Sequence, residues 1–179
     1  MPFEYTIYQL NDTGILHQYQ FIFPLRYSLP LNFSTDPVWR GKRAKYAYST
    51  PGNESMITAL ERGYRWGDYL LFATFNLNQL QGGDRTYAYN LKNNTLISFS
   101  RVTGDSTTYY LPILTGLFEQ VNAIYDHTIF SSMPSFEVFD VKNKIDKKIT
   151  YPETLRQYFT TGNKNDNAVI IQLQLKPNL

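Results

Sequence analysis

The most regular alternation of apolar and polar segments lies between Met56 and Val102. Three connections that are polar or contain glycine separate four segments rich in Tyr, Phe, Ile and Leu, residue types that fit a pleated, half-buried surface. These segments are Met56–Arg62, Tyr69–Asn76, Thr86–Leu91 and Thr95–Val102. The pattern predicts four antiparallel strands in about 45 residues, which is the size of one β-propeller blade. An antiparallel meander in a β-sandwich has the same pattern and is the alternative.

The individual segments predict how each strand is buried. Tyr69–Phe75 is apolar on both faces, which indicates a strand buried between two layers. Thr86–Leu91 alternates, with Tyr87, Tyr89 and Leu91 on one face. The following Asn residues, up to Asn94, favour a tight hairpin because Asn tolerates positive φ better than most residues.

Both ends of the chain also contain strand patterns. A hairpin is predicted from Glu4–Leu10 and Ile15–Phe23 around the turn Asn11–Gly14. Near the other end, Thr150–Glu153 has the form of a capping box for a short helix that ends at Gly162. The residues that follow alternate up to Leu175, which predicts a closing strand.

A short motif recurs in the chain, in the order aromatic, polar, aliphatic and polar turn. Its copies are Tyr8–Asp12, Tyr89–Asn93 and, less clearly, Phe139–Asn143. The third copy implies a strand followed by a charged, exposed turn over Lys142–Lys148. The irregular spacing indicates blades with insertions of variable length.

Composition agrees with an all-β class. The 179 residues are enough for one domain or part of one, and aromatic residues make up 16% of them. A net charge of +2 gives no global field for nucleic acid, so we expect no nucleic-acid partner. The chain has no cysteine, which excludes disulfides, thiolate metal sites and a cysteine nucleophile. No apolar run is long enough for a transmembrane helix, and Met1–Glu4 leads directly into a strand pattern, so no signal peptide is predicted in this chain.

The order of these elements resembles the six-bladed β-propeller proteins common in Bacteroidetes. The likeness lies in Thr6–Leu10, in Gly67–Phe72 before Tyr87–Leu91, and in the ending Lys164–Lys176, where Ala168 replaces the usual proline. It implies a single partial propeller domain over residues 1–179 with two to three blades, the best defined at 56–102. Because family members are about twice as long and usually begin with a lipoprotein-type leader, the resemblance also implies a location in the cell envelope. It assigns no catalytic residue.

The best candidate for ligand contact is the predicted connection between the first two strands of the blade. Its candidate ligand-binding residues are Arg62, Tyr64, Arg65 and Trp66. Propellers usually bind through such connections, and an aromatic platform beside Arg suits sugars or carboxylated ligands. The alternative is a tight turn whose aromatic side chains pack between blades.

A basic and aromatic patch is the second candidate site. It consists of Trp39, Arg40, Lys42 and Arg43, followed by Lys45. Asp36 is positioned to cap a short helix that has Pro37 at its first position. The patch suits an anionic ligand or a nucleic-acid strand. A solvated turn whose aromatic residues pack inward is the favoured alternative.

No motif identifies catalytic residues, metal ligands or a cofactor. His17 is expected to be partly buried and hydrogen-bonded on its strand, and Asp126–His127 lies in a turn without forming a dyad. Asn163–Asn167 lacks the carboxylate density of a calcium site.

These features favour a non-catalytic binding module of a cell-envelope propeller, with a glycan or peptide as its ligand. The alternatives are a fragment of a propeller lyase or hydrolase and a purely structural domain. Open blade edges also predict self-association.

Overall fold

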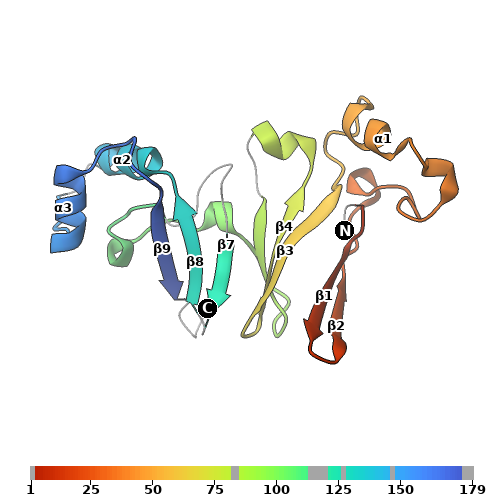
Figure 1. Ribbon diagram of the computed structural model, residues 1–179, viewed down its shortest axis with the longest axis horizontal. Coiled ribbons are helices and arrows are strands. Elements are labelled where there is room, and N and C mark those ends of the chain that lie inside the picture. Colours follow the sequence, from red (N-terminus) through yellow and green to blue (C-terminus); the bar gives the residue numbers. More distant parts are fainter. Residues whose placement is uncertain (1–2, 82–84, 113–120, 126–127, 146–147, 175–179) are drawn as a thin grey trace. The chain divides into compact units, whose positions relative to one another are not determined.

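The computed structural model describes residues 3–81, 85–112, 121–125, 128–145 and 148–174. Its contacts divide the chain into two compact units, Met1–Ser98 and Phe99–Leu179. The sheets are antiparallel and have two, four and three strands, and three short α-helices accompany them (Figure 1). The predicted all-β class with antiparallel sheets is therefore confirmed.

The first unit begins with the predicted hairpin. Strands β1 (Thr6–Asn11) and β2 (Gly14–Gln20) pair antiparallel, with a register shift beside Leu10. The Asn11 side chain accepts a hydrogen bond from Thr13 N at 3.0 Å, and Gly14 follows with φ of 134°, a conformation that glycine adopts without steric cost.

A four-stranded antiparallel sheet follows, in the order β3-β4-β5-β6. Its strands are β3 (Ala59–Trp66), β4 (Tyr69–Phe75), β5 (Thr86–Asn90) and β6 (Leu96–Ser98). The four predicted strands of the central stretch are thus confirmed, and residues Leu70–Thr74 of β4 are buried on both faces as expected. At the hairpin between β5 and β6, Asn94 has φ of 61°, so the predicted role of an Asn in this turn is also confirmed.

Two boundaries of this sheet differ from the prediction. The first strand continues to Trp66, so its connection to β4 contains only Gly67 and Asp68. The last strand ends at Ser98, and the 3₁₀ helix η4 (Phe99–Arg101) replaces the rest of the predicted strand.

Short helices lie in the connections of the first unit, three of them between the hairpin and the four-stranded sheet. They are η1 (Leu25–Tyr27), η2 (Pro37–Trp39), α1 (Arg43–Ser49) and, between β4 and β5, η3 (Leu77–Gln81). The Asp36 carboxylate accepts from Val38 N at 2.9 Å, which confirms the predicted cap with Pro37 at the first helical position. Leu29, Phe33 and Ala47 form a buried cluster beneath these helices.

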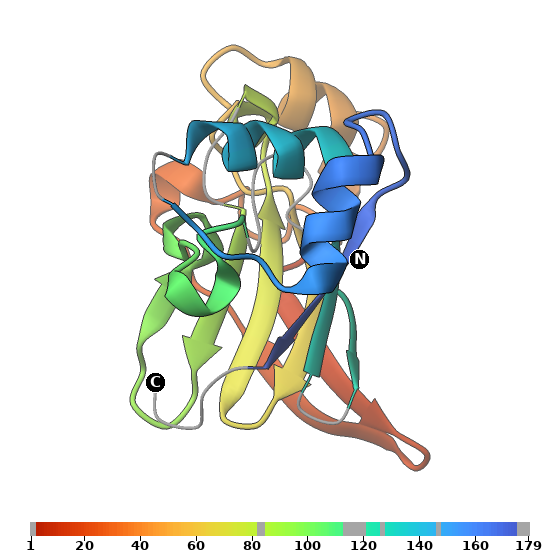
Figure 2. The same cartoon turned by 90° about the vertical axis from the view of Figure 1, so that its left-hand side faces the viewer.

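The second unit contains a three-stranded sheet and two helices. After η5 (Ser106–Thr108), strands β7 (Val121–Tyr125), β8 (Thr128–Met133) and β9 (Val169–Gln174) form the sheet in that order. Helices α2 (Ser135–Lys144) and α3 (Glu153–Thr161) lie between β8 and β9 in the sequence and pack near these strands (Figures 1 and 2). The predicted closing strand is confirmed, since Val169, Ile171 and Leu173 alternate with exposed residues.

Two predictions for the second unit are wrong. Phe139–Asn143 is not a third strand copy but part of α2, and the predicted turn over Lys142–Lys148 begins inside this helix. Glu137 in the first turn and Lys142 and Lys144 in the last turn favour the helix through its dipole. The capping box is wrong as well, because α3 has Pro152 at its N-cap without a side-chain cap; its predicted end at Gly162 is confirmed.

Candidate functional site

A groove of about 570 Å³ lies beside strand β2 and one face of the four-stranded sheet. We call it the hairpin groove. Its lining is aromatic, aliphatic and amide in character and contains no Asp, Glu, Lys or Arg. The lining residues are Gln18, Tyr19, Gln20, Phe21, Ile22, Phe23, Leu70, Phe72, Tyr89, Leu91 and Leu96.

The register of the strands brings these side chains to one face. Leu70 pairs with Tyr89, and Tyr89 pairs with Leu96, so three strands each contribute one wall residue. Residues two apart along a strand share a face, which adds Phe72. Phe21 then packs on Phe72, with ring centroids 4.6 Å apart. This contact joins the hairpin to the sheet at the floor of the groove.

Hydrogen bonds hold the two tyrosines of the groove. The Tyr19 hydroxyl donates to Gln9 Oε1 and accepts from Arg65 Nη1, both at 3.4 Å. The Tyr89 hydroxyl donates to Asn94 Oδ1 at 2.7 Å. Each ring is therefore oriented before any ligand arrives. Ring faces and polar groups occur together on the same surface.

A β-bulge in β3 sets the distance between the hairpin and the sheet. The register shifts between Glu61 and Tyr64, and Arg62 in the bulge has φ of 54°. Gly63 lies directly against Ile7 of β1, where an added Cβ would come within 2.5 Å of Ile7 Cγ2. The absence of a side chain at Gly63 thus allows β1 to approach β3 closely.

The structure does not gather the four predicted ligand residues into one cluster. Arg62 lies exposed in the bulge, and Arg65 points toward Tyr19 beside the hairpin groove. Tyr64 and Trp66 lie on the opposite face, because neighbours in a strand alternate. They stand in a strand rather than in the predicted connection, since β3 continues to Trp66. Ligand contact by these residues stays a prediction.

Trp66 is almost completely buried, and its ring lies 6.0 Å from that of Tyr69. Its indole Nε1 has no hydrogen-bond partner among the described residues. This burial agrees with the packing alternative for the predicted connection.

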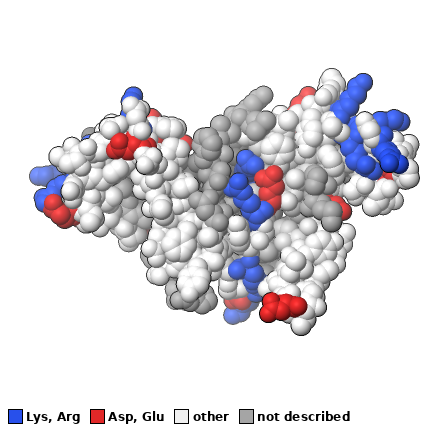
Figure 3. Space-filling view, viewed as in Figure 1, with Lys and Arg blue, Asp and Glu red and all other residues white. Residues whose placement is uncertain are grey.

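The basic patch divides into packed and exposed members. Trp39 packs inward, with its ring centroid 4.9 Å from those of Phe33 and Tyr46. The Arg43 guanidinium donates to the backbone carbonyls of Phe33 at 2.7 Å and Asp36 at 3.2 Å. Arg40, Lys42 and Lys45 are exposed, and basic atoms gather over the region of α1 in Figure 3. The inward packing of the aromatic side chain is confirmed, and anion binding by the exposed residues stays a prediction.

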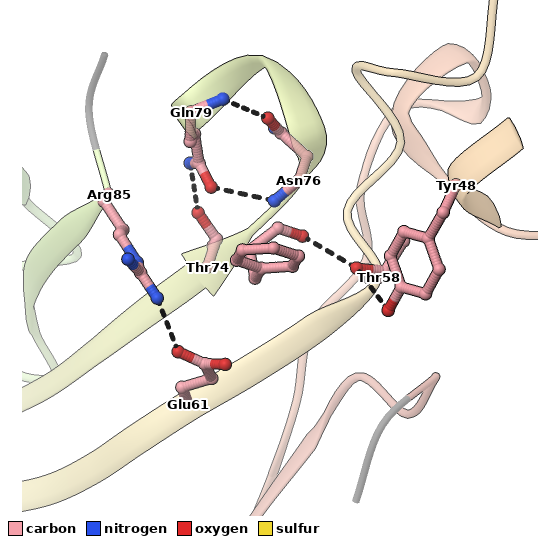
Figure 4. A network of polar contacts seen from close by, with 8 residues as sticks. Tyr48, Thr58, Glu61, Thr74, Asn76, Gln79 and Arg85 are labelled. Carbon is pink, nitrogen blue, oxygen red and sulfur yellow. Dashed lines mark hydrogen bonds and ion pairs between the residues drawn. The ribbon is translucent and has the colours of Figure 1, made fainter. Parts of the chain in front are cut away.

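A polar network closes the end of the four-stranded sheet (Figure 4). Glu61 and Arg85 form an ion pair at 2.9 Å, and the guanidinium of Arg85 lies 5.5 Å from the ring centre of Phe75. Thr58 binds the Phe75 carbonyl through its backbone N–H at 2.7 Å and through its hydroxyl at 3.2 Å. These groups are paired with one another, so the network stabilises the sheet end and presents no free reactive group.

A second part of this network fixes the turn after β4. Asn76 and Gln79 exchange two hydrogen bonds of 2.9 Å between side chain and backbone, and Gln79 Nε2 donates to Thr74 Oγ1 at 2.8 Å. The Tyr48 hydroxyl reaches Thr58 Oγ1 at 3.5 Å from α1.

One tyrosine is perturbed by its surroundings. The Tyr5 hydroxyl donates to the Ile57 carbonyl at 2.6 Å and accepts from Leu29 N at 2.8 Å. Burial raises the pKa of Tyr5 above its ordinary value of 10.0, and the Leu29 hydrogen bond opposes part of the rise. These bonds tie β1 to the following loops and serve the fold.

In the described ranges, no three His, Cys, Asp or Glu residues come together as metal ligands. The carboxylate of Asp166 accepts from Asn163 N at 2.8 Å and from Asn163 Nδ2 at 2.7 Å, so it closes its own loop. His17 is exposed on β2, which corrects the expected partial burial. Asp126 and His127 lie outside the described residues. No described helix is both long and apolar enough to cross a membrane.

Sequence reasoning missed the hairpin groove. The apolar segments that build it, Tyr19–Phe23 and Tyr69–Phe75, were both visible as strands. Only their packing against each other, as at Phe21 and Phe72, creates a concave surface. The alternation of Gln and aromatic residues at 18–21 was the available signal.

Comparison with known proteins gives a fold-level relationship. No protein-family model matches the chain, and no curated protein matches it. The structure is similar to the crystal structure of a "Putative exported protein" from Bacteroides fragilis, with a TM-score of 0.51 and 12% identity. The match covers 98% of this chain and 46% of that chain, so this chain spans less than half the length of the solved protein.

Proposed function

We propose that this chain is a non-catalytic binding module of a cell-envelope protein, and that the hairpin groove holds an uncharged ligand. The observation that carries the proposal is the lining of the groove, in which aromatic faces and amide side chains occur without any charged residue. Binding sites for small ligands are typically concave and mostly apolar, with a few placed polar groups.

The ligand class follows from this chemistry. The rings of Tyr19 and Tyr89 offer flat apolar surfaces, while Gln18 and Gln20 offer donors and acceptors. A neutral glycan presents both C–H faces and hydroxyl groups and matches this set. A charged ligand would lose hydration in the groove without gaining an opposite charge. A neutral glycan is therefore the first candidate, and an uncharged peptide is the second.

The proposal also includes the architecture of the whole protein, which we take to be a β-propeller. A four-stranded antiparallel sheet of blade size, preceded by a hairpin and followed by a three-stranded sheet, supports a partial six-bladed propeller of the Bacteroidetes type. The described export of the structural neighbour supports a location in the cell envelope.

The experiment is a calorimetric titration of the protein with neutral oligosaccharides and with short uncharged peptides. We expect Tyr89→Ala to weaken binding about tenfold, a loss of about 1.4 kcal/mol. Tyr125→Ala is the matched control, because Tyr125 is exposed on β7 of the other unit and does not line the groove. Circular dichroism checks that both variants fold.

Two outcomes would refute the proposal. One is the absence of binding to every neutral oligosaccharide and peptide tested. The other is an equal loss in the Tyr125→Ala control, which would place the ligand elsewhere.

A further inference from the structure

The segment between the hairpin and the four-stranded sheet holds the net positive charge of the protein. Residues 29–49 contain four Lys or Arg and one Asp, which gives this segment a net charge of +3. The whole chain has a net charge of +2, so all other residues together have a net charge of −1. We call residues 29–49 the basic lobe. Figure 3 shows basic atoms gathered over the region of α1, which belongs to this lobe.

The basic lobe has an aromatic centre. Phe33 is almost completely buried, and its ring centroid lies 4.9 Å from that of Trp39 and 5.5 Å from that of Tyr46. The Arg43 guanidinium joins α1 to the preceding turn through the carbonyls of Phe33 and Asp36. These side chains point inward and hold the lobe together.

Three cationic side chains remain on the outside of the lobe, namely Arg40, Lys42 and Lys45. Lys42 and Lys45 are three residues apart at the start of α1, so they are neighbours on one helix face. The two ion pairs found between described residues both lie outside the lobe. Asp36, the one acidic residue of the lobe, caps η2 by accepting from Val38 N. The lobe thus presents cationic groups that no described carboxylate pairs with.

Aliphatic side chains are exposed beside these cationic groups. Leu31 is 90% exposed and Val38 is 57% exposed, and both belong to the lobe. Val38 and Arg40 flank the inward-packed Trp39, so an apolar and a cationic side chain emerge on either side of one packed residue. Exposed apolar groups with a rim of polar side chains mark contact sites for proteins or membranes.

We propose that the basic lobe binds the surface of a membrane that contains anionic lipids. Anionic headgroups supply the negative charge that the exposed cations lack within the protein. The interface below the headgroups accepts the side chains of Leu31 and Val38. Affinity for such a surface grows with the apolar area that enters the interface and with the attraction to anionic lipids. The presence of both kinds of exposed side chain on one lobe carries the proposal.

Soluble polyanions use only part of this surface. A nucleic-acid strand binds through bases that stack on aromatic rings beside cationic groups. The rings of Trp39 and Tyr46 pack on Phe33 instead. An anionic polysaccharide would pair with the cations and leave Leu31 and Val38 in water. A membrane surface engages the cationic and the aliphatic side chains together.

Cosedimentation of the intact chain with lipid vesicles tests the proposal. One kind of vesicle is phosphatidylcholine alone, and the other has equal parts of phosphatidylcholine and phosphatidylglycerol. We expect binding to the second kind only. Since one basic residue near an anionic surface contributes about fivefold to the binding constant, the double variant Lys42→Glu/Lys45→Glu should bind about tenfold more weakly or worse.

The double variant Lys144→Glu/Lys164→Glu is the matched control. Both lysines are exposed in the second unit, and the change in net charge is the same. Because salt screens charges outside the contact, this variant should bind within about threefold of the parent at physiological salt. Circular dichroism checks that both double variants fold. The lobe contributes no residue to the hairpin groove, so membrane contact is separate from the ligand binding proposed above.

The aliphatic side chains have a readout of their own. The chain has no cysteine, so Leu31→Cys supplies a single thiol for an environment-sensitive fluorophore. Entry into the interface should shift the emission to shorter wavelength with the anionic vesicles and leave it unchanged with the neutral ones. Ile170→Cys is the control, because Ile170 is also largely exposed and lies on β9; its label should show no shift.

Four outcomes would overturn the proposal. The parent binds neither kind of vesicle, or it binds both kinds equally. The Lys144→Glu/Lys164→Glu control loses as much binding as the lobe variant. The label at Leu31→Cys shows no shift in vesicle-bound protein. Dextran sulfate binds the lobe while the anionic vesicles do not, which would assign the surface to a soluble polyanion. None of these outcomes depends on the hairpin groove, so the proposed function is tested separately.

Discussion

Gly63 offers a direct test of how the hairpin is attached to the four-stranded sheet. It lies in the bulge of β3, and a Cβ at this position would stand 2.5 Å from Ile7 Cγ2 and 3.3 Å from Ile7 Cδ1. Its φ does not lie in the left-handed region, so alanine at this position is opposed by contact and not by backbone conformation. The perturbation Gly63→Ala is therefore a steric one.

The magnitude follows from the overlap. Carbon atoms in contact normally lie about 3.5–4.0 Å apart, so one of the two elements must move by about 1 Å. Overpacking of this kind costs about 1–3 kcal/mol. Alanine also lowers the conformational entropy of the unfolded chain, which stabilises the folded protein by about 0.4–1 kcal/mol. We expect a net loss of about 1–2 kcal/mol, or a fall in Tm of about 2–8 °C.

The assay is urea unfolding followed by circular dichroism on four proteins: the parent, Gly63→Ala, Ile7→Ala and the double variant. Ile7→Ala removes Cγ1, Cγ2 and Cδ1, the three atoms that the new methyl group would meet. In that background only the entropic gain of about 0.4–1 kcal/mol remains, so the coupling energy between the two positions should equal the cost of the overlap, about 1–3 kcal/mol. Additive effects, or a Gly63→Ala variant as stable as the parent, would refute the reasoning.

Two further predictions concern buried hydrogen bonds. Tyr5→Phe should destabilise the fold by about 1–3 kcal/mol, because the N–H of Leu29 and the carbonyl of Ile57 both lose their partner. Since the folded pKa of Tyr5 is raised, its contribution is complete below pH 10 and is lost as the pH rises through the folded pKa. Urea unfolding between pH 8 and 11 should therefore show a smaller alkaline loss in Tyr5→Phe than in the parent; an equal loss would contradict the assignment. In the second unit, Ser135→Ala should cost about 1–3 kcal/mol, because the buried Ser135 hydroxyl donates to the Asn167 carbonyl, and hydrogen exchange of β9 should accelerate. Unchanged exchange in β9 would show that this bond does not hold the strand.

The local pattern of apolar and polar residues correctly predicted those strands whose formation and burial depend on their own side chains. Tyr69–Phe75 is apolar on both faces and is buried on both faces. The alternation after Ala168 identified β9, and the Asn residues after Leu91 identified the hairpin that Asn94 forms. Each of these features depends on neighbours within a few residues, which is why the sequence sufficed.

The same reasoning failed where a short segment fits a strand and a helix equally well. Phe139–Asn143 repeats the pattern of a true strand, yet it lies in α2, where Phe139 packs against Phe159 with ring centroids 5.4 Å apart. Five residues are too few to separate a period of 2 from a period of 3.6. The contact between Phe139 and Phe159 of α3, twenty residues away, is not visible in these five residues.

What the sequence by itself determined is the class of the protein: its antiparallel strands, their faces, the turns between them, and the absence of thiol chemistry. Tertiary structure alone decided that Arg62 and Gly63 form a bulge within β3 rather than a turn, because Ile7 of another strand needs the space beside Gly63. It also divided the predicted ligand residues between two faces and created the hairpin groove. The physical reason is the same in each case. A strand's period is encoded in adjacent residues, whereas a concave site depends on which distant side chains fill the space between two sheets.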